Sequence, residues 1–148
     1  MKNRQGAGAA WALCAGWMMV IFAFSAAPGD VSGEQSGLIV RLILFLFPWM
    51  PLQTLGVLVR KGAHMTEYAV LFWLYRRALM KSGAKRAALY AFALTVLYAA
   101  TDECHQKFVP GRGPAATDVL IDATGAAAAW AAACIGRKNA RTKREIKN

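Results

Sequence analysis

Ionisable and polar side chains are concentrated in two short segments of an otherwise apolar chain. The first segment opens a hydrophobic run and carries Lys61, His64, Glu67 and Tyr68. An ionisable group inside a bilayer costs roughly 2.5–3.5 kcal/mol by insertion scales, so a membrane chain that keeps many of them is using them. The second segment joins two later hydrophobic runs, and its polar residues are Asp102, Glu103, Cys104, His105, Gln106, Arg112, Asp118 and Asp122.

These residue types fit several chemistries. A carboxylate–histidine pair is suited to acid–base work, and an arginine to holding a phosphate or a carboxylate. An ion-pair network that ties helix ends together is the structural alternative, with Arg112 paired to an acid and Lys61 paired to Glu67 or Asp118. A metal stays open, because no spacing is diagnostic and the mix of oxygen and nitrogen ligands does not name one. Seven residues are competent ligands: His64, Glu67, Asp102, Glu103, His105, Asp118 and Asp122.

Helical spacing predicts that the polar residues of each segment share a face. Residues three, four or seven positions apart lie on the same side of a helix. We therefore expect three helix ends to converge on one shallow polar pocket at the membrane surface, beside the rigid Pro-Gly-Arg-Gly-Pro turn that holds Arg112. The sets with this spacing are Lys61, His64 and Tyr68, with Glu67 beside them; Asp102, His105 and Gln106; and Asp118, Asp122 and Gly125.

The composition indicates a membrane protein of one domain. The chain has 148 residues, 57% of them hydrophobic, and a formal net charge of +10. Its basic residues lie outside the apolar runs, which argues against a nucleic-acid partner and for basic cytoplasmic loops. The three cysteines form no C-x-x-C, so neither a disulfide framework nor a zinc site is suggested.

Four apolar runs are candidates for membrane spans: 7–27, 62–79, 86–101 and 117–135. Thirteen of the 18 Lys and Arg residues precede the first run, separate the second from the third, or follow the fourth. The positive-inside rule then predicts a multi-pass protein of the cell membrane with both termini in the cytoplasm. The polar pocket would face the opposite side.

The remaining segments complete the predicted architecture. The run 38–50 contains Arg41 and stops at two prolines, so we expect an interfacial or re-entrant helix on the outer face, either a capping helix or a substrate lid. Ser25-Ala26-Ala27 leaves a cleaved signal peptide open as an alternative for the first run. The predicted fold is an all-α integral membrane four-helix bundle (1–136) with that additional short helix and a basic, disordered cytoplasmic tail (137–148) suited to anionic lipids.

Together these residues resemble the VanZ-like family of small bacterial membrane proteins over residues 17–135. One departure is Asp122, where many relatives are expected to carry asparagine. The matching features are Phe24-Ser25, Ser32 and Ser36; Arg60-Lys61-x-x-His64-x-x-Glu67-Tyr68; Asp102-Glu103-x-His105-Gln106-x-Phe108-x-Pro110-Gly111-Arg112; and Asp118-Val119 with Gly125.

The resemblance implies a helical membrane domain with a role in the bacterial cell envelope, and a founding member associated with resistance to the glycopeptide teicoplanin. Two functions stay open. In the first, the pocket binds a lipid-linked head group, a glycopeptide or a partner protein, in contact with membrane lipids. In the second, a hydrolase or transferase acts on a lipid or peptidoglycan precursor. His64 or His105 would then be the base, and Arg112 would clamp an anion. The acids Asp102, Glu103 and Asp118 would orient the base or hold a metal. The sequence names no cofactor, and the absence of a nucleophile motif favours the first.

Overall fold

The computed structural model describes residues 6–113 and 115–145, except the side chains at 29–36, 38, 140, 141, 143 and 144. The described part of the chain is all-α and contains no strand. Its helices are α1 (Ala7–Ser25), α2 (Gly29–Leu46), α3 (Leu52–Lys81), α4 (Ala87–Gln106) and α5 (Ala116–Glu145). The side chains of Ser32 and Ser36, two positions of the family resemblance, lie outside the described residues.

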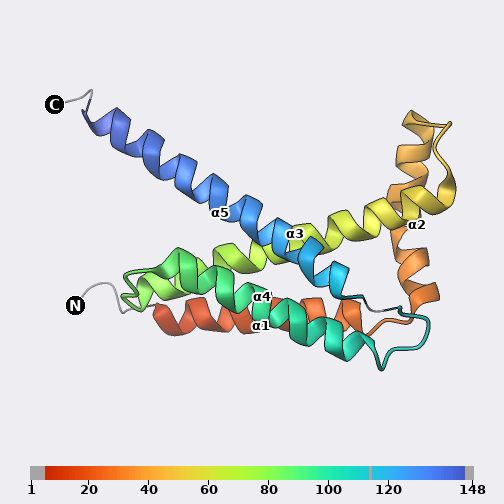
Figure 1. Cartoon of the computed structure of the whole chain (residues 1–148), viewed down its shortest axis with the longest axis horizontal. Coiled ribbons are helices and arrows are strands. Elements are labelled where there is room, and N and C mark those ends of the chain that lie inside the picture. The colour runs from red at the N-terminus through yellow and green to blue at the C-terminus, as the bar shows by residue number, and fades with distance from the viewer. Residues whose placement is uncertain (1–5, 114, 146–148) are drawn as a thin grey trace.

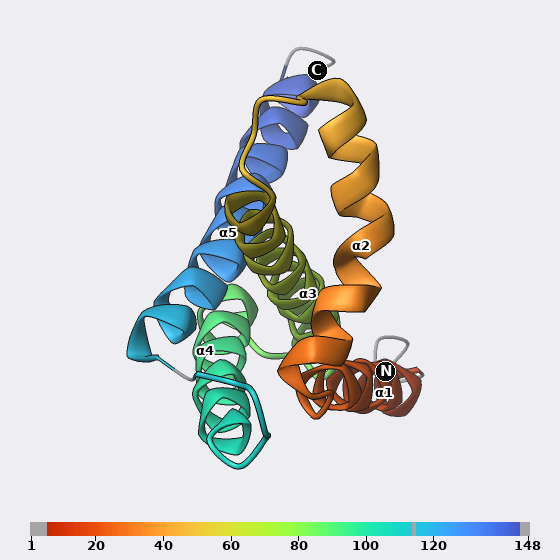
Figure 2. The ribbon, with the colours of Figure 1, turned by 90° about the vertical axis from the view of Figure 1, so that its right-hand side faces the viewer.

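The helices form a bundle whose two ends differ in charge. In Figure 1, α1, α3 and α4 run alongside one another, and α5 crosses them obliquely. The start of α1, the turn from α3 to α4 and the end of α5 point to the same end of the molecule. At the other end, α2 runs across the bundle from the end of α1 to the start of α3 (Figures 1 and 2). The described residues of two basic segments, in the α3–α4 turn and at the end of α5, therefore lie at one end of the bundle.

Two helices begin earlier than the apolar pattern predicts. Helix α2 begins at Gly29, directly after Pro28, and ends at Leu46 instead of covering 38–50. Its end has a local cause, because Phe47 precedes Pro48 and the residue before a proline is driven out of the helical region. Helix α3 begins at Leu52, directly after Pro51, which is ten residues before the predicted start of the second span.

The prediction of a disordered tail is wrong for residues 137–145. Helix α5 continues without a break through Glu145, ten residues past the predicted end of the fourth span. This segment contains no proline, and Ala, Arg, Lys and Glu are all strong helix formers. The end of the apolar run therefore does not mark the end of the helix.

Length and composition make two of the helices candidate membrane spans: Ala7–Ser25 and Ala116–Asn139. Helices α3 and α4 carry the two polar segments, which reduce their hydropathy. The predicted all-α fold class is confirmed, whereas only two of the four predicted membrane spans, the first and the fourth, meet this test among the described residues.

Small side chains let the helices pack closely in the core. Ala91, Ala126 and Gly125 are fully or almost fully buried between neighbouring helices. A Cβ added at Gly125 would overlap the carbonyl oxygen of Met65 and would lie 2.8 Å from its Cα, so α5 touches the α3 backbone at this point. Such contacts between small residues and backbone are the usual means of close packing in membrane helices.

Candidate functional site

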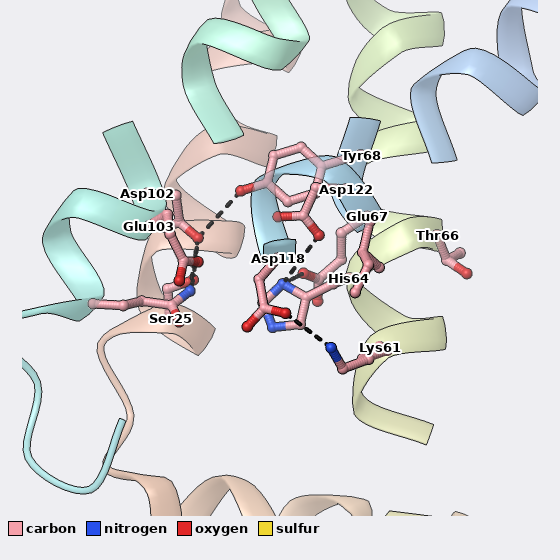
Figure 3. A network of polar contacts seen from close by, with 12 residues as sticks. Ser25, Lys61, His64, Thr66, Glu67, Tyr68, Asp102, Glu103, Asp118 and Asp122 are labelled. Carbon is pink, nitrogen blue, oxygen red and sulfur yellow. Dashed lines mark hydrogen bonds and ion pairs between the residues drawn. The ribbon is translucent and has the colours of Figure 1, made fainter. Parts of the chain in front are cut away.

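A buried carboxylate, Asp102, is bonded to side chains from three helices (Figure 3). Its Oδ2 accepts hydrogen bonds from the Ser25 hydroxyl on α1 (2.6 Å), the Tyr68 hydroxyl on α3 (3.1 Å) and the Gln106 amide on α4 (3.1 Å). Gln106 Nε2 also donates to Ser25 Oγ at 3.2 Å. The other carboxylate oxygen of Asp102, Oδ1, is buried and has no hydrogen-bond partner. Asp102 thus joins α1, α3 and α4 and keeps one acceptor free.

An ion pair between Lys61 and Asp118 joins α3 to α5. The Lys61 Nζ lies 2.9 Å from Asp118 Oδ1, so of the two pairings proposed for Lys61, the one with Asp118 is present. The two side chains are 41% and 38% exposed, and an ion pair so accessible to water contributes about 0–1 kcal/mol. A ligand could therefore replace this pair at small cost.

The imidazole of His64 lies between two carboxylates without a hydrogen bond to either. Its Nδ1 is 3.9 Å from Glu67 Oε2 and 3.9 Å from Asp122 Oδ1, too far for a hydrogen bond. This Nδ1 is buried and unpartnered. In Figure 3 the side chains of His64, Asp118 and Asp122 point toward one another, whereas Thr66 points away.

Arg112 fastens the α4–α5 loop to the end of α1. Its Nε donates to the carbonyl of Ala27 (3.1 Å) and one terminal nitrogen donates to the carbonyl of Phe24 (2.9 Å). These carbonyls belong to the last turn of α1 and the residues after it, where backbone acceptors lack helical partners. None of the acids whose side chains are described forms the proposed pair with Arg112, whose Nε and one terminal nitrogen bind backbone carbonyls instead.

Two charged groups beyond the predicted third span are shifted by burial. Burial raises the pKa of Glu103, opposed by the hydrogen bond that its carboxylate accepts from the Ala115 amide at 2.7 Å. Burial, followed by repulsion from Arg60, lowers the pKa of Arg112. Glu103, in the last turn of α4, and Arg112, in the α4–α5 loop, therefore both lie in partly desolvated surroundings.

A cavity of about 180 Å³ opens between these groups. Its wall carries charges of both signs and two apolar side chains, Val57 and Ile121. The polar residues of the wall are the cations Arg60, Lys61 and Arg112, the acids Glu103, Asp118 and Asp122, and the neutral or titratable His64 and Gln106.

Of the predicted site residues, seven line this cavity, and four do not. Asp102 lies behind the wall and accepts a hydrogen bond from the wall residue Gln106, and Tyr68 donates a hydrogen bond to the same carboxylate. Glu67 lies beside His64. His105 stands apart: its ring packs on Phe22, with ring centroids 4.4 Å apart. The seven lining residues are Lys61, His64, Glu103, Gln106, Arg112, Asp118 and Asp122.

Two residues of the site, Ser25 and Arg60, were not among those predicted. Ser25 is 1% exposed and bonded to Asp102, and Arg60 lines the cavity. Ser25 belongs to the motif Phe24-Ser25 and Arg60 to the motif Arg60-Lys61. Both motifs are part of the family resemblance and could have identified these residues. Within the described residues, no three His, Cys, Asp or Glu side chains are grouped so that they could hold a metal ion.

The sequence model of the VanZ/LLP1 family matches residues 10–137, which is most of the chain. The chain belongs to the VanZ/LLP1 family. The match includes every residue of the cavity wall and the whole Asp102 network, so both are parts of the family domain. No curated protein and no solved structure matches this VanZ/LLP1 chain.

Proposed function

We propose that this VanZ/LLP1 protein is a multi-pass protein of the bacterial cell membrane whose outer cavity binds the phosphate-bearing head group of a lipid-linked envelope molecule. The observation that carries the proposal is the cavity itself, with three cations on a wall that also holds three carboxylates and a histidine. Cations bind a phosphate through charge-assisted hydrogen bonds. The carboxylates accept hydrogen bonds from hydroxyl, amide or ammonium groups of the same head group.

The size of the cavity favours a head group over a whole glycopeptide. Pockets for drug-sized ligands enclose about 300–1,000 Å³. The cavity here measures about 180 Å³, which fits a phosphate or diphosphate with part of a sugar. Val57 and Ile121 supply apolar wall for the first carbons of a lipid chain. Any link to glycopeptide resistance would then run through the lipid-linked precursor and not through capture of the antibiotic.

The proposed topology has α1, α3, α4 and α5 crossing the membrane, with both termini in the cytoplasm and α2 lying along the outer surface. The basic segments at one end of the bundle support this orientation. Retention of α1 is supported by its contacts: Ser25 is bonded to Asp102, and Phe24 and Ala27 accept hydrogen bonds from Arg112. A cleaved leader would remove the Ser25 donor from the buried carboxylate of Asp102 and both carbonyl acceptors from Arg112.

Labelling with a membrane-impermeant thiol reagent tests the orientation. In a background where Cys14, Cys104 and Cys134 are replaced, a cysteine at Ala115 should label in intact cells because it lies in the outer α4–α5 loop. A cysteine at Ser82, in the α3–α4 turn, should label only after the cells are permeabilised. The reverse pattern would overturn both the orientation and the outer placement of the cavity.

Ligand binding is tested with the full chain in neutral detergent and farnesyl diphosphate as the probe. We expect Lys61→Gln to weaken probe binding by about fivefold, because it removes one partly exposed cation from the cavity wall. Lys107→Gln is the matched control: it removes the same charge at the same end of the bundle, from an exposed residue that does not line this cavity. Binding should be measured by thermophoresis.

Equal loss of affinity in both lysine variants would mean that general charge attracts the probe, and would contradict a bound head group. Absence of binding by the unchanged protein would contradict the diphosphate assignment. Farnesyl monophosphate, which has one phosphate fewer, should bind more weakly than the diphosphate.

The second candidate function is a hydrolase or transferase for the same class of lipid-linked molecule. The observation in its favour is His64, whose unpartnered Nδ1 lies 3.9 Å from two carboxylates inside the cavity wall. A bound substrate could tighten these distances, as general bases often require. The substitution His64→Gln separates the two functions. If the protein only binds its ligand, the variant keeps the affinity and neither form releases phosphate. If the protein is an enzyme, the unchanged protein releases phosphate and the variant does not.

A further inference from the structure

A second cavity, of about 490 Å³, lies at the opposite end of the bundle, between α3, α4 and α5. Helix α5 diverges from α3 and α4 toward this end (Figure 1). Four side chains of the wall are cationic: Arg76, Lys85, Arg86 and Arg137. Among the described residues that line it, none is acidic. This cavity therefore differs from the outer one, whose wall carries both signs.

Arg76, one of the arginines that line this cavity, has a side-chain donor without a hydrogen-bond partner. Arg76 Nε is buried and has no hydrogen-bond partner. Its guanidinium carbon lies 5.1 Å from the centre of the Trp73 ring, a cation–π distance. Packing against the ring positions the guanidinium of Arg76 at the cavity wall.

The start of α4 adds backbone donors to the same wall. The N-cap, Arg86, makes no side-chain capping bond, and the first turn holds no acid. The amides of Ala87, Ala88 and Leu89 lack intrahelical acceptors, since the first helical bond runs from Tyr90 N to Arg86 O. All three residues line the cavity. Uncapped amides at a helix start favour an anion, as the four cations do.

The rest of the wall is apolar. Met80, Leu89 and Trp130 line the cavity beside the cations, and Trp130 is held by the ring of Phe92 at 5.3 Å between centroids. A ligand that satisfies both parts of the wall has a phosphate at one end and a hydrocarbon chain at the other. Basic pockets between membrane helices on the cytoplasmic side bind phospholipid head groups of this kind.

We infer that this inner cavity binds the phosphodiester head group of an anionic phospholipid from the cytoplasmic leaflet. The inference is independent of the ligand of the outer cavity and rests only on membrane insertion with this end inside. It assigns Arg76, Arg86 and Arg137 to the phosphate and Trp130 to the acyl chain.

Native mass spectrometry of the full-length protein in neutral detergent tests the inference, with dioleoyl phosphatidylglycerol and dioleoyl phosphatidylcholine as probes. Phosphatidylglycerol should bind at least about tenfold more tightly, because only it carries a net negative charge. The double variant Arg86→Gln with Arg137→Gln should weaken its binding by about tenfold or more.

The matched control is Arg77→Gln with Lys138→Gln, which removes two exposed cations at the same end that do not line the cavity. It should change the affinity for phosphatidylglycerol by less than about twofold, because these residues contribute only the general attraction of a basic surface. Equal losses in the two double variants, or equal binding of the two lipids, would overturn the inference. Displacement of phosphatidylglycerol by inorganic phosphate at equal concentration would show a site for the free anion and would overturn the assignment to a lipid.

Discussion

Replacement of Asp102 by alanine is expected to lower the free energy of unfolding by about 3–5 kcal/mol, the largest effect of any single polar substitution in this chain. The change removes one acceptor and leaves the donors of Ser25, Tyr68 and Gln106 in a dry environment. Ser25 and Tyr68 are 1% and 0% exposed, so water cannot replace the lost oxygen. A buried donor without a partner costs about 1–3 kcal/mol, and more than one is left here. The measurement is the unfolding midpoint in mild detergent.

Two further substitutions show whether burial is the cause. Asp102→Asn keeps the size and one carbonyl oxygen and should cost less than half as much. Asp118→Ala removes a carboxylate that is 38% exposed, and should cost about 1 kcal/mol or less. If Asp102→Ala and Asp118→Ala shifted the midpoint equally, Asp102 would not be the buried junction of α1, α3 and α4. The affinity of the folded Asp102→Asn protein for farnesyl diphosphate would report on the cavity separately from stability.

The sequence predicts the helices well because apolar runs and prolines are local signals. Pro48, where the predicted run 38–50 stops, directly follows the C-cap of α2, and Pro28 and Pro51 are the N-caps of α2 and α3. The errors arise where hydropathy was taken for helix length. Residues 136–145 are mostly polar or basic yet helical, because Ala, Arg, Lys and Glu are strong helix formers whatever their hydropathy. Residues 29–37 are also helical, although Gly29, Gly33 and Gly37 are weak helix formers, so neither apolar content nor propensity predicts the start of α2.

The candidate site is predictable in part, for a similar reason. Helical spacing places Lys61 and His64 on one face, and both line the cavity. The Ser25–Asp102 bond joins residues 77 positions apart. Helix α1 is apolar nearly all round, so its sequence does not specify which side faces the core. Arg112 could not be assigned either, because it binds backbone carbonyls, which look alike at every position.

Gly125 tests how closely α3 and α5 approach. We expect Gly125→Ala to destabilise the fold by about 1–3 kcal/mol, since the new methyl group would overlap the backbone carbonyl of Met65 and force the helices apart. Helix propensity alone predicts the opposite sign, because alanine favours a helix over glycine by about 1 kcal/mol.

Gly136→Ala, in the same helix, is the control that separates these two effects. A Cβ at Gly136 meets nothing within 4 Å, so this substitution should stabilise the protein or leave the unfolding midpoint unchanged. Separation of α3 from α5 should also stretch the Lys61–Asp118 pair, which joins the same two helices and forms part of the cavity wall. Gly125→Ala should therefore weaken binding of farnesyl diphosphate, while Gly136→Ala should not. Equal midpoints and equal affinities for the two variants would contradict a direct backbone contact between α5 and α3.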